Sequence, residues 1–400
     1  MPEFCHLVCV TSVNNNKFYD MQDLGNGEFE AKYGRIGVTC TSVRYPISRW
    51  NSIYNSKIKK GYIDQTHLVS VPAVTKTTDV YKSIENADIA RLIAYLREAA
   101  RDTVTKNYTV ASTQVTPTMV AKAQSILNRL VNIADRASLR EFNDSLIELF
   151  GVIPRKMANV SNHLAGSRNE FGNIIQREQR LLDVMAGQVS GNVVEEKISG
   201  DSSMTVLEAF GLEFSPVTEK DVAIIKKELG PDCAHMFYKA WRVENKETRK
   251  KFKAFCKGKG RLTKKLLWHG SRTENWWGIL RSGLVLRPTN AVINGKMFGY
   301  GLYFAPKARK SVRYTSMRGS TYAHGTSQYG FLSLYEVAYG KPYDVDNNAG
   351  CNDMTWAKLQ KVAPGCSSLH AHAGRVLVND EIIVYREDQT TIKYLVELKA

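Results

Sequence analysis

The chain has 400 residues, of which 43% are hydrophobic and 24% charged, with a formal net charge of +16. This length predicts two or three domains, and the composition is typical of a soluble globular protein. No apolar run reaches the roughly 18 residues of a membrane span, so we expect no membrane partner. The seven cysteines form no C-x-x-C pair, which predicts reduced thiols in a cytosolic or nuclear compartment rather than disulfides or structural zinc.

The positive charge is concentrated in the second half of the chain. Residues 204–400 carry 31 Lys and Arg against 18 Asp and Glu, while residues 1–70 carry 8 against 6 and residues 71–203 carry 16 against 15. Much of the excess lies in KETRKKFKAFCKGKGRLTKK, which starts at Lys246. Such a segment is either a nucleic-acid-binding surface or a solvated helix and loop, and the sequence does not decide between them.

The first segment, residues 1–70, is predicted to be a small β-rich domain. HLVCVTSV and KFYDMQDL are short runs rich in β-branched and aromatic residues, and Asn26-Gly27 is a strong hairpin sequence. A helix should follow in SRWNSIYNSKIKK, where Trp50, Ile53 and Ile58 recur at helical spacing.

The second segment, residues 77–189, is predicted to be helical throughout. Its apolar residues recur at the helical period in TMVAKAQSILNRLVNIADR and SLREFNDSLIELF, and Gly151 and Pro154 end the latter run. Residues 190–203, SGNVVEEKISGDSS, lose this periodicity and predict a linker.

The third segment, residues 204–400, mixes helices and strands. Strands are expected in GLYFAP, YGFLSLYEVAYG, EIIVYRE and IKYLVELKA, with few helices between them. That order favours a split, mostly antiparallel sheet over a doubly wound one, so the predicted fold class is multidomain α+β.

Several common functional motifs are absent from the sequence. It has no P-loop and no G-x-S-x-G elbow, and Gly299-Tyr300-Gly301 lacks the third glycine of a dinucleotide fingerprint. His370-x-His372 and Cys233-x-His235 could each contribute to a metal site. Isolated pairs of this kind are more often ordinary surface residues, so no metal is predicted.

Three motifs, in order and spacing, resemble the catalytic domain of poly(ADP-ribose) polymerases: LLWHGSRTENWWGIL, MFGYGLYFAPKARKSVRYT and NDEIIVY. The resemblance covers residues 204–400. The helical segment resembles the family's regulatory helical domain at AQSILNRL, LIELFGVIP and QRLLDV. The first segment resembles its DNA-binding WGR domain through NKFYDMQ and YGRIG, with Tyr33 where that domain has its tryptophan.

The resemblance implies an NAD+ site with His269-Gly270-Ser271 as one wall. His269 would bond the adenine-side ribose, Gly270 would present its backbone to the nicotinamide carboxamide, and Ser271 would complete that clamp. Outside this context the three residues would be read as a strand end followed by turn formers.

Further cofactor-binding residues follow from the same resemblance. The rings of Tyr303 and Tyr314 would enclose the nicotinamide, and Ser311, three residues before Tyr314, would reach the carboxamide. Asn275 and Arg287 match family positions near the riboses and the adenosine part.

Glu381 is the predicted catalytic carboxylate. Breaking the nicotinamide–ribose bond passes through an oxocarbenium-like state that a carboxylate stabilises. Asp380 is the neighbouring rival, but the family pattern has Glu three residues before Val-Tyr, as in Glu381-Ile-Ile-Val-Tyr. His269, Tyr303 and Glu381 together match the catalytic set of polymer-forming members.

The resemblance therefore implies an NAD+ ADP-ribosyltransferase that needs no metal, and more finely a DNA-dependent poly(ADP-ribose) polymerase. Its partners would be broken or nicked DNA and protein acceptors including itself. It would be nuclear in a eukaryote, and otherwise cytoplasmic and DNA-associated. The alternatives are a mono-ADP-ribosyltransferase and a DNA-binding scaffold with a vestigial catalytic domain. Tyr300 and Lys296 depart from the family pattern on the acceptor side.

Overall fold

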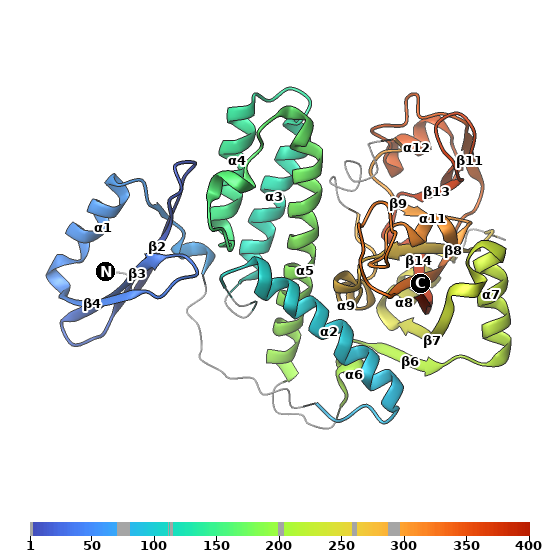
Figure 1. The fold of residues 1–400 in the computed structure, drawn as a ribbon, viewed down its shortest axis with the longest axis horizontal. Coiled ribbons are helices and arrows are strands. Elements are labelled where there is room, and N and C mark those ends of the chain that lie inside the picture. Colours follow the sequence, from blue (N-terminus) through green and yellow to red (C-terminus); the bar gives the residue numbers. More distant parts are fainter. Residues whose placement is uncertain are drawn as a thin grey trace. The chain divides into compact units, whose positions relative to one another are not determined.

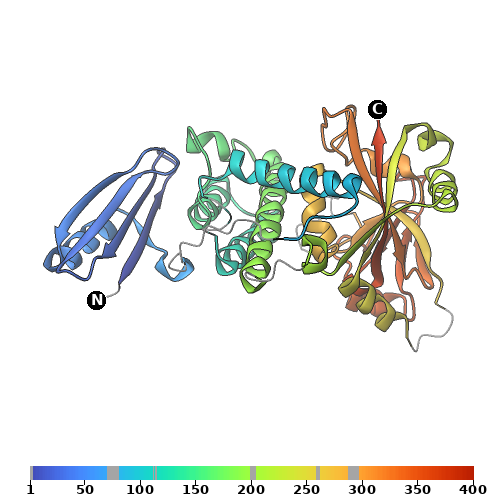
Figure 2. The same cartoon turned by 90° about the horizontal axis from the view of Figure 1, so that it is seen from below.

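The computed structural model describes residues 3–69, 81–110, 112, 115–198, 204–257, 262–286 and 297–400, and the side chains of 192–198 lie outside this description. Contacts divide the chain into two compact units. The first comprises residues 1–77 and 101–193, and the second residues 78–100 and 194–400. Figure 1 labels the elements of both units, and Figure 2 shows the same ribbon turned by 90°. None of the helices within the described ranges has both the length and the apolar character of a membrane span.

The first unit begins with a five-stranded antiparallel sheet in the order β4-β3-β2-β1-β5. Helix α1 packs on it through Trp50, whose ring lies 5.0 Å from that of Phe29. Both side chains are buried, so the predicted β-rich segment with its helix is confirmed. The elements are β1 (Phe4–Val10), β2 (Asn16–Asp23), β3 (Glu28–Arg35), β4 (Thr41–Pro46), α1 (Trp50–Lys59) and β5 (Ile63–Asp64).

The rest of the first unit is helical, and helices α3, α4 and α5 lie side by side (Figures 1 and 2). Helix α4 starts with a capping box in which Ser138 and Glu141 satisfy each other's backbone amides. The rings of Phe142 and Phe171 stack between α4 and α5 at 3.7 Å. The helices are α2 (Ala87–Asn107), α3 (Pro117–Ile133), α4 (Leu139–Val152) and α5 (Phe171–Ile198).

Two boundaries differ from simple expectation. Helix α5 continues to Ile198, into the segment from Ser190 that the sequence predicts as a linker. Helix α2 belongs to both units, because residues up to Ala100 cluster with the second unit and residues from Arg101 with the first. The predicted domain limits therefore stay predictions.

The second unit contains two sheets, which confirms the predicted split and mostly antiparallel arrangement. One is antiparallel with the order β6-β7-β14-β10-β8, and the other has the order β11-β12-β13-β9, with β11 and β12 parallel. Its strands are β6 (Leu212–Pro216), β7 (Phe237–Asn245), β8 (Lys265–Ser271), β9 (Leu302–Phe304), β10 (Tyr329–Val337), β11 (Pro342–Val345), β12 (Ser368–Ala371), β13 (Glu381–Val384) and β14 (Thr390–Lys399). Its helices, besides the start of α2, are α6 (Val206–Ala209), α7 (Glu219–Cys233), α8 (Lys246–Cys256), α9 (Thr273–Ser282), α11 (Ala308–Val312) and α12 (Trp356–Val362).

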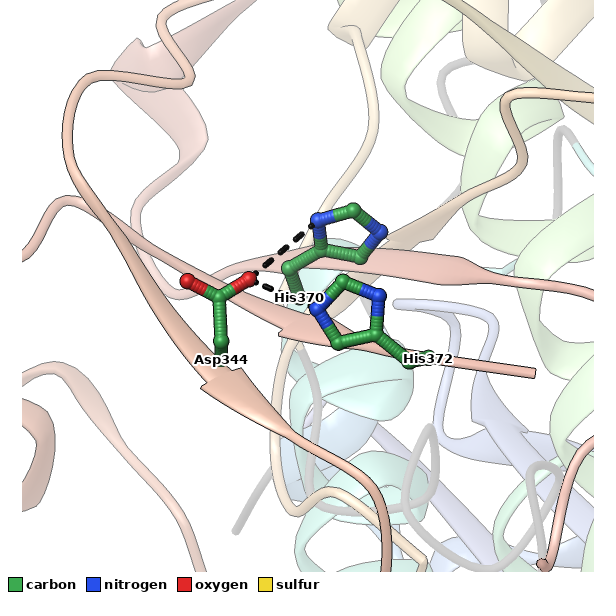
Figure 3. A group of neighbouring side chains, drawn as sticks. All are labelled: Asp344, His370 and His372. Carbon is green, nitrogen blue, oxygen red and sulfur yellow. Dashed lines mark hydrogen bonds and ion pairs between the residues drawn. The ribbon is translucent and has the colours of Figure 1, made fainter. Parts of the chain in front are cut away.

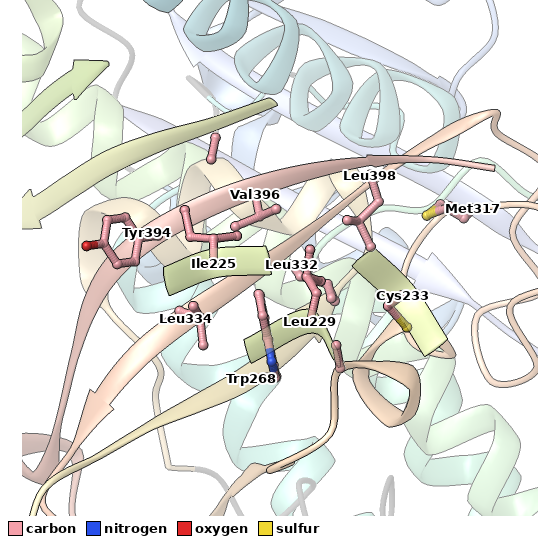
Figure 4. Close-up of a cluster of buried hydrophobic side chains, with 12 residues drawn as sticks. Ile225, Leu229, Cys233, Trp268, Met317, Leu332, Leu334, Tyr394, Val396 and Leu398 are labelled. Carbon is pink, nitrogen blue, oxygen red and sulfur yellow. The ribbon is translucent and has the colours of Figure 1, made fainter. Parts of the chain in front are cut away.

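The two sheets meet where Trp268 of β8 pairs with Ala305, just after β9, through two backbone hydrogen bonds of 2.9 Å. The indole of Trp268 is fully buried beneath helix α7, and its Nε1 donates to the carbonyl of Glu228 at 3.0 Å. Figure 4 shows this core, in which Ile225 and Leu229 of α7 face the first sheet. The second unit is thus built around a well-packed apolar centre.

The basic segment that starts at Lys246 forms helix α8 up to Cys256, and its last residue, Lys265, begins strand β8. Phe252 and Phe255 are buried beneath the helix. Lys246, Arg249 and Lys251 each pair with a carboxylate. These pairings favour a solvated helix over a nucleic-acid surface.

A buried ion pair in the first unit allows a test of stability. The guanidinium of Arg155 pairs with Glu178, and both side chains are at most 5% exposed. Arg155→Met leaves a buried carboxylate without its main partner, so we expect about 3–5 kcal/mol less free energy of local unfolding. Hydrogen exchange of the α3–α5 amides measures it.

The matched control is Arg177→Met, because Arg177 also bonds Glu178 but is 43% exposed. That variant should cost at most about 1 kcal/mol. Equal losses in the two variants would contradict the importance of burial at Arg155.

Candidate active site

Strand β8 extends through the whole His269-Gly270-Ser271 motif, and helix α9 begins at Thr273 after a single residue. The motif is held as a strand because β10 pairs with it, with Ser333 opposite His269 and Phe331 opposite Ser271. The motif therefore lies within the strand itself and not in a turn between the strand and the helix.

His269 is held by the backbone of Tyr303. Its Nδ1 lies 3.2 Å from the Tyr303 carbonyl oxygen, which can only accept, so Nδ1 carries the proton. Burial lowers the pKa of His269 below its usual range, although the bond to Tyr303 opposes this. The ring is therefore neutral near pH 7, with Nε2 left as a hydrogen-bond acceptor.

The backbone of Gly270 lies so close to the backbone of Ser311 that no residue with a side chain fits at this position. A Cβ at this position would lie 2.0 Å from the carbonyl oxygen of Ser311. The hydroxyl of Ser311 donates to the Trp268 carbonyl at 3.2 Å. The C-terminal end of helix α11 is thereby fixed against strand β8, and Gly270 itself has no side chain to cover its backbone.

Ser271 and Asn275 form a second polar pair one helical turn apart. The Asn275 amide donates to the Ser271 hydroxyl at 3.0 Å. The Oδ1 atom of Asn275 is buried and has no hydrogen-bond partner among the residues that the structure describes. A buried acceptor of this kind normally has a partner, so it is suited to a donor on a ligand.

Tyr303 and Tyr314 lie close enough to Glu381 for its charge to shift the pKa of each phenol. Burial chiefly, and then the Glu381 carboxylate, raises the pKa of each phenol above its usual range. The Tyr303 hydroxyl donates to the Gly299 carbonyl at 3.0 Å, and the Tyr314 ring stacks on Tyr322 at 4.7 Å. Both rings are thus fixed by other contacts.

Glu381 begins strand β13 and is only 7% exposed. Strand β9 pairs with β13 so that Tyr303 stands opposite Ile383, two residues after Glu381. Side chains two residues apart in a strand point the same way, so Tyr303 and Glu381 share one face of the sheet. The rival carboxylate, Asp380, instead bonds His370 at 3.0 Å.

Lys310 is a site residue that the motifs did not single out. Its ammonium group pairs with the Glu381 carboxylate, and the two side chains are 12% and 9% exposed. Burial lowers the pKa of Lys310, while Glu381 opposes that shift. Lys310 directly precedes Ser311, but Glu381 is 71 positions further on, so the sequence pattern alone could not pair them.

The structure thus brings together eight of the nine predicted site residues in one region. They are His269, Gly270, Ser271, Asn275, Tyr303, Ser311, Tyr314 and Glu381. Arg287 and the departure Lys296 lie outside the described residues.

Known proteins resemble this chain in the same region. Residues 225–400 match the family model of the poly(ADP-ribose) polymerase catalytic domain. Putative poly [ADP-ribose] polymerase-like 100L of Invertebrate iridescent virus 6 is 30% identical, over 40% of this chain and 85% of its own length. Uncharacterized protein 101L of the same virus is 32% identical over 58% of this chain and 97% of its own length.

A further relative extends the match toward the N-terminus. Rice poly [ADP-ribose] polymerase 2-B is 24% identical over 96% of this chain and 70% of its own length. The chain spans less than half the length of several other matching poly [ADP-ribose] polymerases. The chain belongs to the poly(ADP-ribose) polymerase family and is an NAD+ ADP-ribosyltransferase.

The Lys310–Glu381 pair gives a direct test of the site's geometry. Lys310→Met leaves the Glu381 carboxylate buried without its cation. We expect the free energy of unfolding of the transferase part to fall by about 3–5 kcal/mol, as for other buried pairs that lose one partner. Denaturant unfolding followed by tryptophan fluorescence measures the loss.

Lys307→Met is the control, because Lys307 is exposed and lies three residues earlier. It should change the free energy of unfolding by no more than about 0.5 kcal/mol. A Lys310 variant as stable as this control would show that Glu381 does not depend on the pair.

Proposed function

We propose that this protein is a DNA-dependent poly(ADP-ribose) polymerase. It transfers ADP-ribose from NAD+ to protein side chains, including its own, elongates the polymer and releases nicotinamide. The observation that carries the proposal is the buried Glu381 carboxylate, held by Lys310 on the sheet face that also bears Tyr303. His269, bonded to the Tyr303 backbone, completes the set implied by the family resemblance.

Each NAD+ contact has a physical basis in the site. The neutral His269 ring offers Nε2 to a ribose hydroxyl. The bare backbone of Gly270 and the hydroxyl of Ser271 bind the nicotinamide carboxamide, with Ser311 beside them. The unpartnered Oδ1 of Asn275 accepts from a further hydroxyl. Arg287 is proposed for the adenosine part on the resemblance alone.

The aromatic rings suit the leaving group. Nicotinamide in NAD+ is a flat cationic ring, which favours the π-face of a tyrosine. Tyr303 and Tyr314 provide two such faces, each held in place by other contacts. Their phenols stay protonated because burial and Glu381 raise the pKa of both.

The proposed chemical role of Glu381 follows from its charge and burial. The bond between nicotinamide and the ribose C1′ breaks, and positive charge develops on the ribose. A carboxylate in a water-poor site stabilises that charge and accepts a hydrogen bond from the 2′-hydroxyl. The acceptor hydroxyl oxygen then attacks C1′ and releases its proton to solvent, while nicotinamide leaves with the electrons of the broken bond. Lys310 is a positioning residue, since it acts through Glu381.

Dependence on DNA is proposed from the first unit and from helix α2. The first segment resembles a DNA-binding module, and the match to the rice relative extends across 96% of the chain. Helix α2 is anchored in the second unit by Asp88, which accepts from Lys239 at 2.6 Å and from the Trp241 indole at 3.0 Å. The same helix continues into the first unit, so DNA binding could loosen this anchor. The protein would then be nuclear in a eukaryote, or otherwise cytoplasmic and DNA-associated.

The first experiment tests the chemistry. Glu381→Gln keeps the shape of the side chain and removes its charge, so NAD+ binding should persist while elongation slows by about 10²–10³-fold. Incubation with labelled NAD+ and a denaturing gel measures elongation, and calorimetry measures NAD+ binding.

Asp380→Asn is the matched control, because it removes the adjacent carboxylate, which bonds His370. It should still form polymer. A sharp band from the parent chain would identify single-unit transfer, and no label would identify a scaffold. Unchanged polymer length in Glu381→Gln would refute the role of Glu381.

A second experiment tests activation. We expect weak labelling of the full chain without DNA and strong labelling with nicked duplex DNA, because binding to the loosened state shifts the equilibrium toward it. Closed circular duplex DNA of the same sequence is the control. The stimulation should decline with salt, because phosphate contacts release counterions. A labelling rate that nicked DNA does not change would refute DNA dependence, but it would not contradict the transferase activity.

A further inference from the structure

A second cluster of functional side chains lies on strands β11 and β12. Asp344 of β11 and His370 of β12 are register partners in the parallel pair, and His372 follows β12. Figure 3 shows both imidazole rings turned toward the Asp344 carboxylate, and the rings lie 4.0 Å apart, 30° from parallel. The His370-x-His372 pair noted in the sequence therefore has a third partner that is distant along the chain.

The spacing of the three groups is that of metal ligands. The Oδ1 atom of Asp344 lies 2.7 Å from Nε2 of His372 and 3.6 Å from Nδ1 of His370, and all three ligand atoms lie within 4.8 Å of one another. Ligands of a tetrahedral zinc ion, bound at about 2.0–2.2 Å, are about 3.3–3.5 Å apart. The 2.7 Å contact is a hydrogen bond in which Nε2 of His372 carries the proton, so an ion binds once Nε2 has released that proton and the two side chains have moved apart slightly.

Asp380 orients His370 from the other side of the ring. Its Oδ2 lies 3.0 Å from Nε2 of His370, and its Oδ1 accepts from the Ala373 amide at 2.8 Å. A carboxylate only accepts, so Nε2 carries the proton and Nδ1 keeps its lone pair on the Asp344 side. The Tyr339 hydroxyl, 3.0 Å from Nδ1, donates to that lone pair and would be displaced by an ion. Metal-bound histidines commonly have such a carboxylate partner.

The cluster is separate from the NAD+ site. Ala371 is the register partner of Glu381, so these two side chains share a face of the sheet. His370 and His372 flank Ala371 and therefore lie on the opposite face. The side chains of Asp344 and His372 are 56% and 44% exposed, which leaves room for a solvent ligand.

We propose that Asp344, His370 and His372 form a binding site for a divalent transition-metal ion of the zinc class. Two imidazoles and one carboxylate suit zinc, cobalt or nickel, whereas magnesium and calcium prefer oxygen ligands. Three protein ligands leave one position open to water. Asp380 is a positioning residue for His370. The site does not depend on the proposed polymerase function.

The test uses the full chain after removal of bound metal by a chelator. Zinc is titrated by calorimetry, and cobalt by visible absorption. We expect one equivalent to bind, with affinity reduced at least tenfold in His372→Ala and in Asp344→Asn. Asp380→Asn should reduce it by about 10–100-fold, the usual effect of losing a partner of a metal-bound histidine. Far-ultraviolet circular dichroism checks the folding of each variant.

Asp346→Asn is the matched control, because it removes an exposed carboxylate two residues from Asp344 and should leave the affinity unchanged. The seven free cysteines are the competing ligands, and a thiolate-to-cobalt absorption band would reveal them. Such a band, no binding by the parent chain, or an affinity unchanged in His372→Ala would overturn the proposal.

Discussion

The catalytic part of the chain depends on a close backbone contact between strand β8 and the segment that follows β9. Trp268 pairs with Ala305 across the two sheets, and two residues later a Cβ on Gly270 would collide with the Ser311 carbonyl. This contact places the His269 motif, Tyr303 and helix α11 beside one another, although they are up to 43 positions apart. The apolar cluster beneath helix α7 stabilises this contact, because Trp268 belongs both to the cluster and to the contact.

The second constraint is electrostatic. A carboxylate as buried as Glu381 is costly unless it is paired, and Lys310 provides the pair from the first helix after the contact. The position of α11 therefore fixes Ser311, beside the Gly270 backbone, and Lys310, beside Glu381, at the same time. Because Lys310 and Ser311 are adjacent residues of one short helix, a shift of that helix would disturb the proposed nicotinamide contact and the proposed catalytic carboxylate together.

Local patterns predicted most of the fold, whereas contacts between distant residues could not be predicted. The Ser138–Glu141 capping box and the helical period of the second segment define their helices from neighbouring residues alone. Helix α5 runs past Ser190 although the apolar period is lost there, so periodicity underestimated its length. The resemblance supplied the eight described site residues. It did not supply Lys310, whose pairing arises only when helix α11 meets strand β13, nor the carboxylates around His370 and His372, which come together only when strands β11, β12 and β13 align.

Strand β13 connects the candidate active site with the cluster of Asp344, His370 and His372, because successive side chains of a strand point to opposite faces of the sheet. Glu381 points to the face that carries Tyr303, while the preceding Asp380 bonds the histidine pair behind it. A change that moves the start of β13 must therefore act on both faces. An ion bound by His370 on the face of the sheet opposite Glu381 would favour the position of Asp380 that best orients the His370 ring. It would thereby restrict the backbone that carries Glu381, without contacting any reacting atom. An ion bound by Asp344, His370 and His372 would thus support strand β13 through Asp380, without any contact to NAD+.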